Sequence, residues 1–148
     1  MAQYTFLVVD DHHAEARRTI QQLNLAFPSS AILHAASGKE AFDLLEESRT
    51  VPSLIFLDYI LPDMNGAEFI GKLRSRRWLD DAPVAILTEP VADRAVILCY
   101  RLGAVAFLTK PSLVHELRET AREFARPSRS LTAATFVPPT IAPRRTAA

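Results

Sequence analysis

Four short apolar runs in this sequence each end at a side chain that could take part in chemistry. These ends supply the carboxylates of Asp10, Asp11 and Asp58, the hydroxyl of Thr88 and the ammonium of Lys110. Carboxylates that gather in one place repel one another, and a hard divalent cation such as Mg²⁺ relieves that repulsion by binding their oxygens. A carboxylate beside a cation, an ammonium and a hydroxyl can attack phosphorus, so these residue types indicate phosphoryl transfer with Asp58 as the nucleophile.

The predicted elements bring these four ends to one edge of a sheet. Short, mostly apolar runs predict buried strands, over residues 6–9, 31–36, 54–57, 84–87 and 105–108. Apolar residues at steps of three and four predict amphipathic helices, over residues 13–27, 39–48, 67–77, 92–102 and 113–126. Alternating strands and helices imply an α/β fold with a doubly wound five-stranded parallel sheet, (βα)5 and flavodoxin-like, with strand order 2-1-3-4-5.

Composition limits the classes of partner and compartment. Lys and Arg together number 17, as do Asp and Glu, so no bulk field attracts nucleic acid or an anionic membrane, and neither is expected as a direct partner. Cys99 is the only cysteine, which excludes an intrachain disulfide framework, and no apolar run approaches a membrane-spanning length. We therefore expect a cytoplasmic protein with one domain over residues 4–126 and a flexible tail, rich in Pro, Ala and Thr, over residues 127–148.

Five segments of the chain resemble the receiver domain of two-component response regulators. They are VVDD at 8–11, ASGKEAFDLL at 36–45, LDYILPDMNG at 57–66, LT at 87–88 and GAVAFLTKP at 103–111. The resemblance covers residues 4–126 and implies a stand-alone, single-domain response regulator that accepts a phosphoryl group on Asp58. The donor would be a sensor histidine kinase or a histidine phosphotransfer protein, the cofactor would be Mg²⁺, and the protein would not be an enzyme in its own right.

The resemblance also implies a set of ligands for Mg²⁺. The carboxylates of Asp10, Asp11 and Asp58 and the backbone carbonyl of Ile60 would hold the cation. Asp11 would bind it directly, and Asp10 would act partly through water.

Further roles follow from the resemblance at the other strand ends. Thr88 and Lys110 would contact phosphoryl oxygens, and the Lys110–Pro111 peptide would be cis. Phe107 matches the switch aromatic of the family, which turns inward when the hydroxyl of Thr88 moves toward the phosphate.

Three residues near the expected site depart from the family pattern. Glu89 stands directly after Thr88, where receivers commonly have a small residue, and its charge would repel phosphate if it faced the site. Ile60 and Pro90 lie two residues after Asp58 and Thr88, beside the path of an attacking water that neither side chain can hydrogen-bond. We therefore predict that phospho-Asp58 hydrolyses slowly by itself, at a rate set by these three side chains.

The fourth predicted helix is expected to carry the output surface. Four of its residues are predicted to face the sheet, Val96, Ile97, Cys99 and Tyr100. The outward residues, with an aromatic from the fifth strand, would form an apolar strip with arginines at its rim: Val91, Arg94, Ala95, Leu98, Arg101 and Phe107. Such a strip, on the face formed by the fourth helix, fifth strand and fifth helix, suggests docking of a downstream protein or homodimerisation.

Other interpretations use the same residues differently. The chain could be a receiver-like interaction module with vestigial phosphorylation, or a phosphate sink. A phosphatase of the haloacid dehalogenase kind needs two acids separated by one residue, whereas Asp10 and Asp11 are adjacent. His12 and His13 are predicted to be solvated residues of the first helical turn, because a carboxylate site for Mg²⁺ does not require imidazole.

Overall fold

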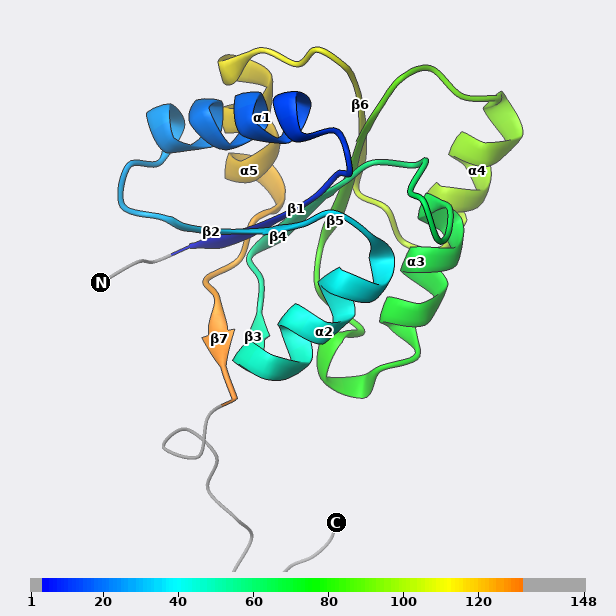
Figure 1. Cartoon of the computed structure of the whole chain (residues 1–148), viewed down its shortest axis with the longest axis horizontal. Coiled ribbons are helices and arrows are strands. Elements are labelled where there is room, and N and C mark those ends of the chain that lie inside the picture. Colours follow the sequence, from blue (N-terminus) through cyan, green and yellow to red (C-terminus); the bar gives the residue numbers. More distant parts are fainter. Residues whose placement is uncertain (1–3, 132–148) are drawn as a thin grey trace, which may run out of the picture.

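Five apolar segments lie side by side as the parallel sheet of this molecule (Figure 1). The structure is a computed structural model that describes residues 4–131. The strands of this sheet are β1 (Thr5–Val9), β2 (Ala31–Ala35), β4 (Leu54–Leu57), β5 (Val84–Thr88) and β6 (Ala106–Thr109). Their order, β2-β1-β4-β5-β6, is the predicted order 2-1-3-4-5, because the short β3 takes a number without joining this sheet. The predicted flavodoxin-like fold is therefore confirmed.

Helices cover both faces of the sheet. They are α1 (His13–Ala26), α2 (Gly38–Ser48), α3 (Gly66–Arg74), the 3-10 helix η1 (Arg77–Leu79), α4 (Asp93–Arg101) and α5 (Val114–Phe124). Helices α1 and α5 pack on one face, and α2, α3 and α4 pack on the other (Figure 1). Among the described residues, no helix has the length and apolar character that a membrane crossing requires.

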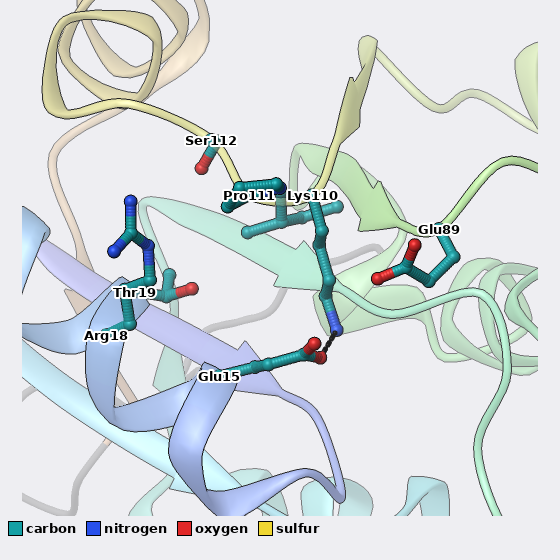
Figure 2. A pocket seen from close by; sticks show the side chains of 8 residues that line it. Glu15, Arg18, Thr19, Glu89, Lys110, Pro111 and Ser112 are labelled. Carbon is teal, nitrogen blue, oxygen red and sulfur yellow. Dashed lines mark hydrogen bonds and ion pairs between the residues drawn. The ribbon is translucent and has the colours of Figure 1, made fainter.

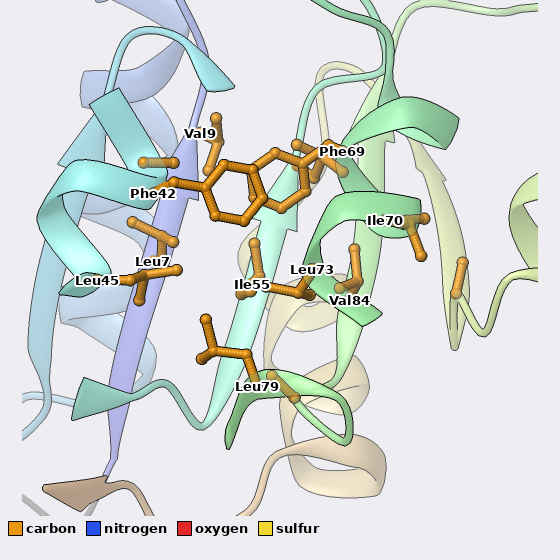
Figure 3. Packing of buried hydrophobic residues seen from close by; sticks show 14 of the residues in the cluster. Leu7, Val9, Phe42, Leu45, Ile55, Phe69, Ile70, Leu73, Leu79 and Val84 are labelled. Carbon is orange, nitrogen blue, oxygen red and sulfur yellow. The ribbon is translucent and has the colours of Figure 1, made fainter. Parts of the chain in front are cut away.

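Side chains of the central strands alternate between the two helical layers. In β1, Leu7 packs in the layer of α2 and α3, whereas Phe6 packs in the layer of α1 and α5. All four residues of β4 are buried, as expected for a central strand covered on both faces. In the first layer the rings of Phe42 and Phe69 stack with their centroids 4.7 Å apart (Figure 3). This packing fixes the strand that ends at Asp58.

The loop that follows β4 is fastened to two helix N-termini. The Asp63 carboxylate accepts hydrogen bonds from the backbone N–H groups of Gly38 (2.9 Å) and Lys39 (2.8 Å), at the start of α2. Asn65 caps α3 and forms a capping box with Glu68, so the predicted turn at this point does begin the helix. Both contacts satisfy N–H groups that have no partner within their helix, and together they hold the loop in one position.

The chain closes with a strand that the sequence analysis did not predict. β7 (Arg129–Ser130) pairs antiparallel with β3 (Thr50–Val51), and the N–H of Leu131 donates to the carbonyl of Arg49. β7 therefore lies within residues 127–148, the segment predicted as a flexible tail. The rest of the predicted tail, residues 132–148, lies outside the described residues.

Helix α4 presents a different face to the sheet from the one predicted. Cys99 is its only buried residue, whereas Ile97 and Tyr100, which were predicted to face inward, are 52% and 47% exposed. Ile97 was predicted to face inward because it is apolar, but steps of three and four residues place it on the same helical face as Arg94 and Arg101, which are also exposed. Gly103, with φ of +105°, follows the helix as the predicted left-handed terminating residue.

Candidate functional site

The carboxyl ends of four strands bring the predicted residues to one place. Asp10 follows β1, Asp58 follows β4, Thr88 ends β5 and Lys110 follows β6. Backbone hydrogen bonds continue the sheet through these ends, from the Asp58 N–H to the Val9 carbonyl and from the Lys110 N–H to the Thr88 carbonyl. The strands therefore deliver two carboxylates, a hydroxyl and an ammonium to the same edge.

The buried carboxylate of Asp58 is held on both of its oxygens. Its Oδ1 accepts hydrogen bonds from Thr88 Oγ1 at 2.8 Å and from the backbone N–H of Ile60 at 3.1 Å. Its Oδ2 accepts one from Lys110 Nζ at 2.9 Å. Only 5% of the side chain is exposed. Asp58 thus stands at the centre of the polar groups that sequence reasoning brought together.

Lys110 is surrounded by carboxylates. Its Nζ also donates to Asp10 Oδ2 at 2.6 Å and to Glu15 Oε1 at 2.8 Å. Burial alone would lower the pKa of Lys110, but its hydrogen bonds to Asp10, Glu15 and Asp58 outweigh that effect and hold the pKa well above its ordinary value. Lys110 is therefore charged at any physiological pH.

Glu15 was missed by the sequence analysis. It lies in the first turn of α1, four residues after Asp11, and helical geometry turns it back toward the sheet edge. Its four-residue spacing from Asp11 was the only feature of the sequence that could have indicated Glu15 as a site residue. Its presence means that four carboxylates and one ammonium share this edge.

Four residues could contribute ligand atoms to a cation. One atom each from Asp10, Asp11, His12 and Asp58 lies within 4.8 Å of all the others. Asp11 Oδ1 is buried, and within residues 4–131 no group gives it a hydrogen bond. A buried carboxylate oxygen without a donor, facing other carboxylates, fits a metal ion, because such an oxygen is otherwise costly to desolvate.

His12 is exposed, as predicted, but it faces the acids. Its side chain is 62% exposed, and its Nδ1 lies 3.3 Å from both Asp10 Oδ1 and Asp11 Oδ1. The charge of Asp11 and a hydrogen bond to Asp10 raise the pKa of His12 above its ordinary value. The ring is solvated as predicted, and the turn after β1 also brings its Nδ1 close to the carboxylates.

An open pocket of about 330 Å³ lies beside the buried lysine (Figure 2). Its lining comes from α1, the end of β5 and the loop after β6, and consists of Glu15, Arg18, Thr19, Leu87, Glu89, Lys110, Pro111 and Ser112. Glu89 is exposed, and its carboxylate points toward the Lys110 side chain in Figure 2. The Lys110–Pro111 peptide at the pocket is cis, as the resemblance implied.

The residues predicted for output lie on and around α4. Arg94, Leu98 and Arg101 are exposed, while Val91 and Ala95 are half-buried. A shallow hollow of about 480 Å³ lies beside this face, between α4 and the loop after β4, lined by Tyr59, Val91, Ala92, Arg94, Ala95 and Leu98.

Phe107 is the predicted switch aromatic on β6. It is half-buried, and its ring lies against that of Tyr100 on α4, with the centroids 5.6 Å apart. The two rings connect the strand beside the acidic site to the exposed side of α4.

Comparison with known proteins gives a consistent result. The sequence model of the response regulator receiver domain matches residues 6–122. A chemotaxis protein CheY homolog from Campylobacter jejuni is 33% identical over 113 residues, which cover 76% of this chain and 85% of the relative. A CheY-like receiver domain protein from Methanospirillum hungatei has a similar structure, with a TM-score of 0.73 and 26% identity over 82% of this chain and 93% of that one.

A metal-bound receiver is also among the similar structures. The Mn²⁺-bound form of response regulator Rcp1 has a TM-score of 0.68 and 26% identity, over 81% of this chain and 90% of its own. The matched sequence, the fold and the acidic pocket with its lysine all agree. This chain belongs to the response regulator receiver domains, which are phospho-accepting signalling modules of two-component systems rather than enzymes in their own right.

Proposed function

We propose that Asp58 accepts a phosphoryl group from the phosphohistidine of a sensor histidine kinase or a histidine phosphotransfer protein. A carboxylate oxygen of Asp58 would form a bond to phosphorus while the bond between phosphorus and the donor imidazole breaks. The observation that carries this proposal is the buried Asp58 carboxylate, held between Thr88 and Lys110 at the sheet edge. This edge is where open α/β sheets bind their ligands, and the cytoplasm is the compartment we infer for the exchange.

Charge balance supports a divalent cation as the cofactor. The carboxylates of Asp10, Glu15 and Asp58 contact one ammonium, and Asp11 adds a further negative charge nearby. A phosphoryl group would be repelled by this excess, and Mg²⁺ would offset most of it when bound. We infer that Asp10, Asp11, Asp58 and the backbone carbonyl of Ile60 hold Mg²⁺. The similar structure of Rcp1 in its Mn²⁺-bound form supports a divalent cation as the cofactor.

The hydroxyl and the ammonium would change partners once Asp58 is phosphorylated. Thr88 Oγ1 and Lys110 Nζ now donate to the two oxygens of Asp58, and both can turn to phosphoryl oxygens instead. Lys110 keeps Asp10 and Glu15 as partners during that movement. Displacement of Thr88 would leave room for Phe107 to turn inward and so alter its contact with Tyr100.

The output surface would then be the side of α4, β6 and α5 that these rings reach. Its proposed contacts are Val91, Arg94, Ala95, Leu98, Arg101 and Phe107. A downstream protein or a second copy of this chain would dock there. Sedimentation distinguishes the two: if the phosphorylated protein dimerises and Leu98→Glu does not, the strip serves homodimerisation, whereas a monomer in both cases favours a different protein partner.

Phosphorylation in vitro tests the acceptor. We expect acetyl phosphate with Mg²⁺ to add one phosphoryl group to the parent chain and none to Asp58→Asn. Asp43→Asn, which changes an exposed carboxylate on α2, is the matched control and should incorporate phosphate as the parent does. No incorporation by the parent, and no beryllofluoride binding, would favour the interaction module with vestigial phosphorylation.

A phosphate sink remains the second candidate for a chain that does incorporate phosphate. A phosphate sink must release phosphate quickly, and Glu89 would slow that release. Its carboxylate, beside the pocket, would repel attacking hydroxide as well as phosphate. With Ile60 and Pro90, both exposed and apolar, Glu89 supports slow self-hydrolysis of phospho-Asp58. A long-lived phosphoryl group suits signalling by docking better than rapid disposal of phosphate.

A further inference from the structure

The side chain of His12 lies among the strand-end acids, although it does not cap the helix that follows it. It precedes α1 at the N-cap position, but its side chain makes no capping hydrogen bond there. Its Nδ1 instead lies 3.3 Å from Asp10 Oδ1 and Asp11 Oδ1, and 3.8 Å from Glu15 Oε1 and Asp58 Oδ2. One nitrogen thus faces four carboxylates.

The spacing of these atoms resembles that of ligands around one ion. In an octahedral site with ligands about 2.1 Å from the metal, neighbouring ligand atoms are about 3 Å apart and opposite ones about 4.2 Å apart. The ligand atoms of Asp10, Asp11, His12 and Asp58 are already within 4.8 Å of one another. Asp11 Oδ1 accepts no hydrogen bond among the described residues, although His12 Nδ1 lies 3.3 Å from it.

We propose that His12 Nδ1 is itself a ligand of the cation and makes the site favour imidazole-binding metals such as Ni²⁺, Co²⁺ and Zn²⁺ relative to Mg²⁺. This inference rests on the proposed cation site and adds a nitrogen to its oxygen ligands. Mg²⁺ retains water and prefers oxygen, so it gains little from the ring. Later first-row metals bind imidazole well, so they gain a full ligand.

A purely electrostatic role for His12 makes the opposite prediction. If the ring only offers positive charge to the acids, its removal increases the negative charge of the site and every divalent cation binds more tightly. If the ring is a ligand, its removal weakens binding of Ni²⁺ and leaves Mg²⁺ nearly unchanged. The sign of the change in Ni²⁺ affinity therefore separates the two roles.

The experiment is calorimetric titration of the parent, His12→Ala and His13→Ala with Mg²⁺ and with Ni²⁺ at pH 8. His13 is the matched control, since it is also exposed and in the same turn, but its ring packs against His34, with centroids 6.3 Å apart. We expect His12→Ala to lose about tenfold or more in Ni²⁺ affinity, comparable with the loss of a group that supports a metal ligand, and less than about threefold in Mg²⁺ affinity. His13→Ala should match the parent.

Proton NMR of the Co²⁺-loaded protein gives an independent readout. A coordinated imidazole shows a hyperfine-shifted N–H signal that disappears in D₂O, which we expect in the parent and in His13→Ala but not in His12→Ala.

The outcomes separate this inference from the proposed function. Unchanged or tighter Ni²⁺ binding by His12→Ala would overturn the role of His12 while leaving the Mg²⁺ site and phosphorylation of Asp58 intact. Failure of the parent to bind either metal would overturn both the cation site and the role of His12.

Discussion

Helices α3 and α4 have the same length and cover the same face of the sheet, yet they are held very differently. α3 buries five of its nine residues and begins with a capping box, whereas α4 buries only Cys99 and has no side-chain cap. The tightly held helix follows the loop after Asp58, and the loosely held one carries the proposed output residues. Because α4 has fewer buried residues and no side-chain cap, we expect it to shift at smaller energetic cost than α3.

The largest effect is expected when one isoleucine in each helix is truncated. Ile70 on α3 is fully buried, and Ile97 on α4 is 52% exposed. Because truncation of a buried isoleucine leaves a cavity, we expect Ile70→Ala to lower the free energy of unfolding by about 2–5 kcal/mol. Ile97→Ala should change it by about 1 kcal/mol or less.

Urea denaturation measures both variants under the same conditions. Equal losses would mean that α4 is packed as firmly as α3, and the contrast between a fixed and a movable helix would be lost.

The next test concerns the loops that precede the two helices. Ile60 and Pro90 stand in these loops and offer no side-chain hydrogen bond to a water that attacks phospho-Asp58. Ile60→Asn supplies such a group, and we expect self-hydrolysis to become about tenfold faster, the equivalent of ~1.4 kcal/mol in the barrier. The measurement is the decay of phosphorylated protein after the phosphodonor is removed.

Ile60→Val, which keeps the side chain apolar, should decay at the parental rate. An unchanged rate in Ile60→Asn would show that water positioning does not limit hydrolysis.

Exchanging the helix caps sharpens the comparison at a smaller scale. Asn65→Ala removes the capping side chain of α3 and should cost about 1 kcal/mol of stability. Ala92→Asn introduces a side-chain acceptor at the extended N-cap position of α4 and should gain up to about 1 kcal/mol.

Hydrogen exchange of the α4 amides shows where the gain acts. These amides should exchange more slowly in Ala92→Asn than in the parent, and no change there would argue that the end of α4 is already well ordered.

The smallest expected effect is the pH dependence that Asp63 contributes to the α3 side. Burial raises the pKa of Asp63, but hydrogen bonds from the N–H groups of Lys39 and Gly38 outweigh that effect and lower the pKa below its ordinary value. A lowered pKa in the folded state stabilises the fold above pH 3.8, and this stabilisation is lost as the pH falls through the folded-state pKa.

Asp63→Asn should therefore lose this part of the pH dependence while most of the stability at pH 7 remains, because the group is largely exposed. Urea denaturation between pH 2 and 7 (about the range of a carboxyl titration) compares it with the parent. Parallel stability curves for the two proteins would show that ionisation of Asp63 does not strengthen its contact with α2.

The sequence predicted the site better than its surroundings, for identifiable physical reasons. A buried strand that ends in an acid is a local pattern, so the positions of Asp10, Asp58 and Lys110 followed from the strands and their order. Glu15 and the orientation of His12 depend on how α1 starts after β1, which spacing alone does not give.

Two other features were not predicted, for different reasons. Ile97 on α4 was assigned to the inward face from its apolar side chain alone, although its spacing places it beside Arg94 and Arg101 on the exposed face. Strand β7 consists of an arginine and a serine, and it pairs with β3 through backbone groups and distant contacts that leave no hydrophobic pattern.

The pairing of β3 and β7 also determines where the chain enters and leaves the domain. Thr5, at the start of β1, has its hydroxyl 3.2 Å from that of Ser128, just before β7. Both ends of the described chain therefore meet at the amino edge of the sheet, opposite the carboxyl edge that carries Asp58. Adjacent ends make a domain suitable for insertion into a host loop. Grafted in this way, the receiver would project as a pendant module with its acceptor facing away from the host.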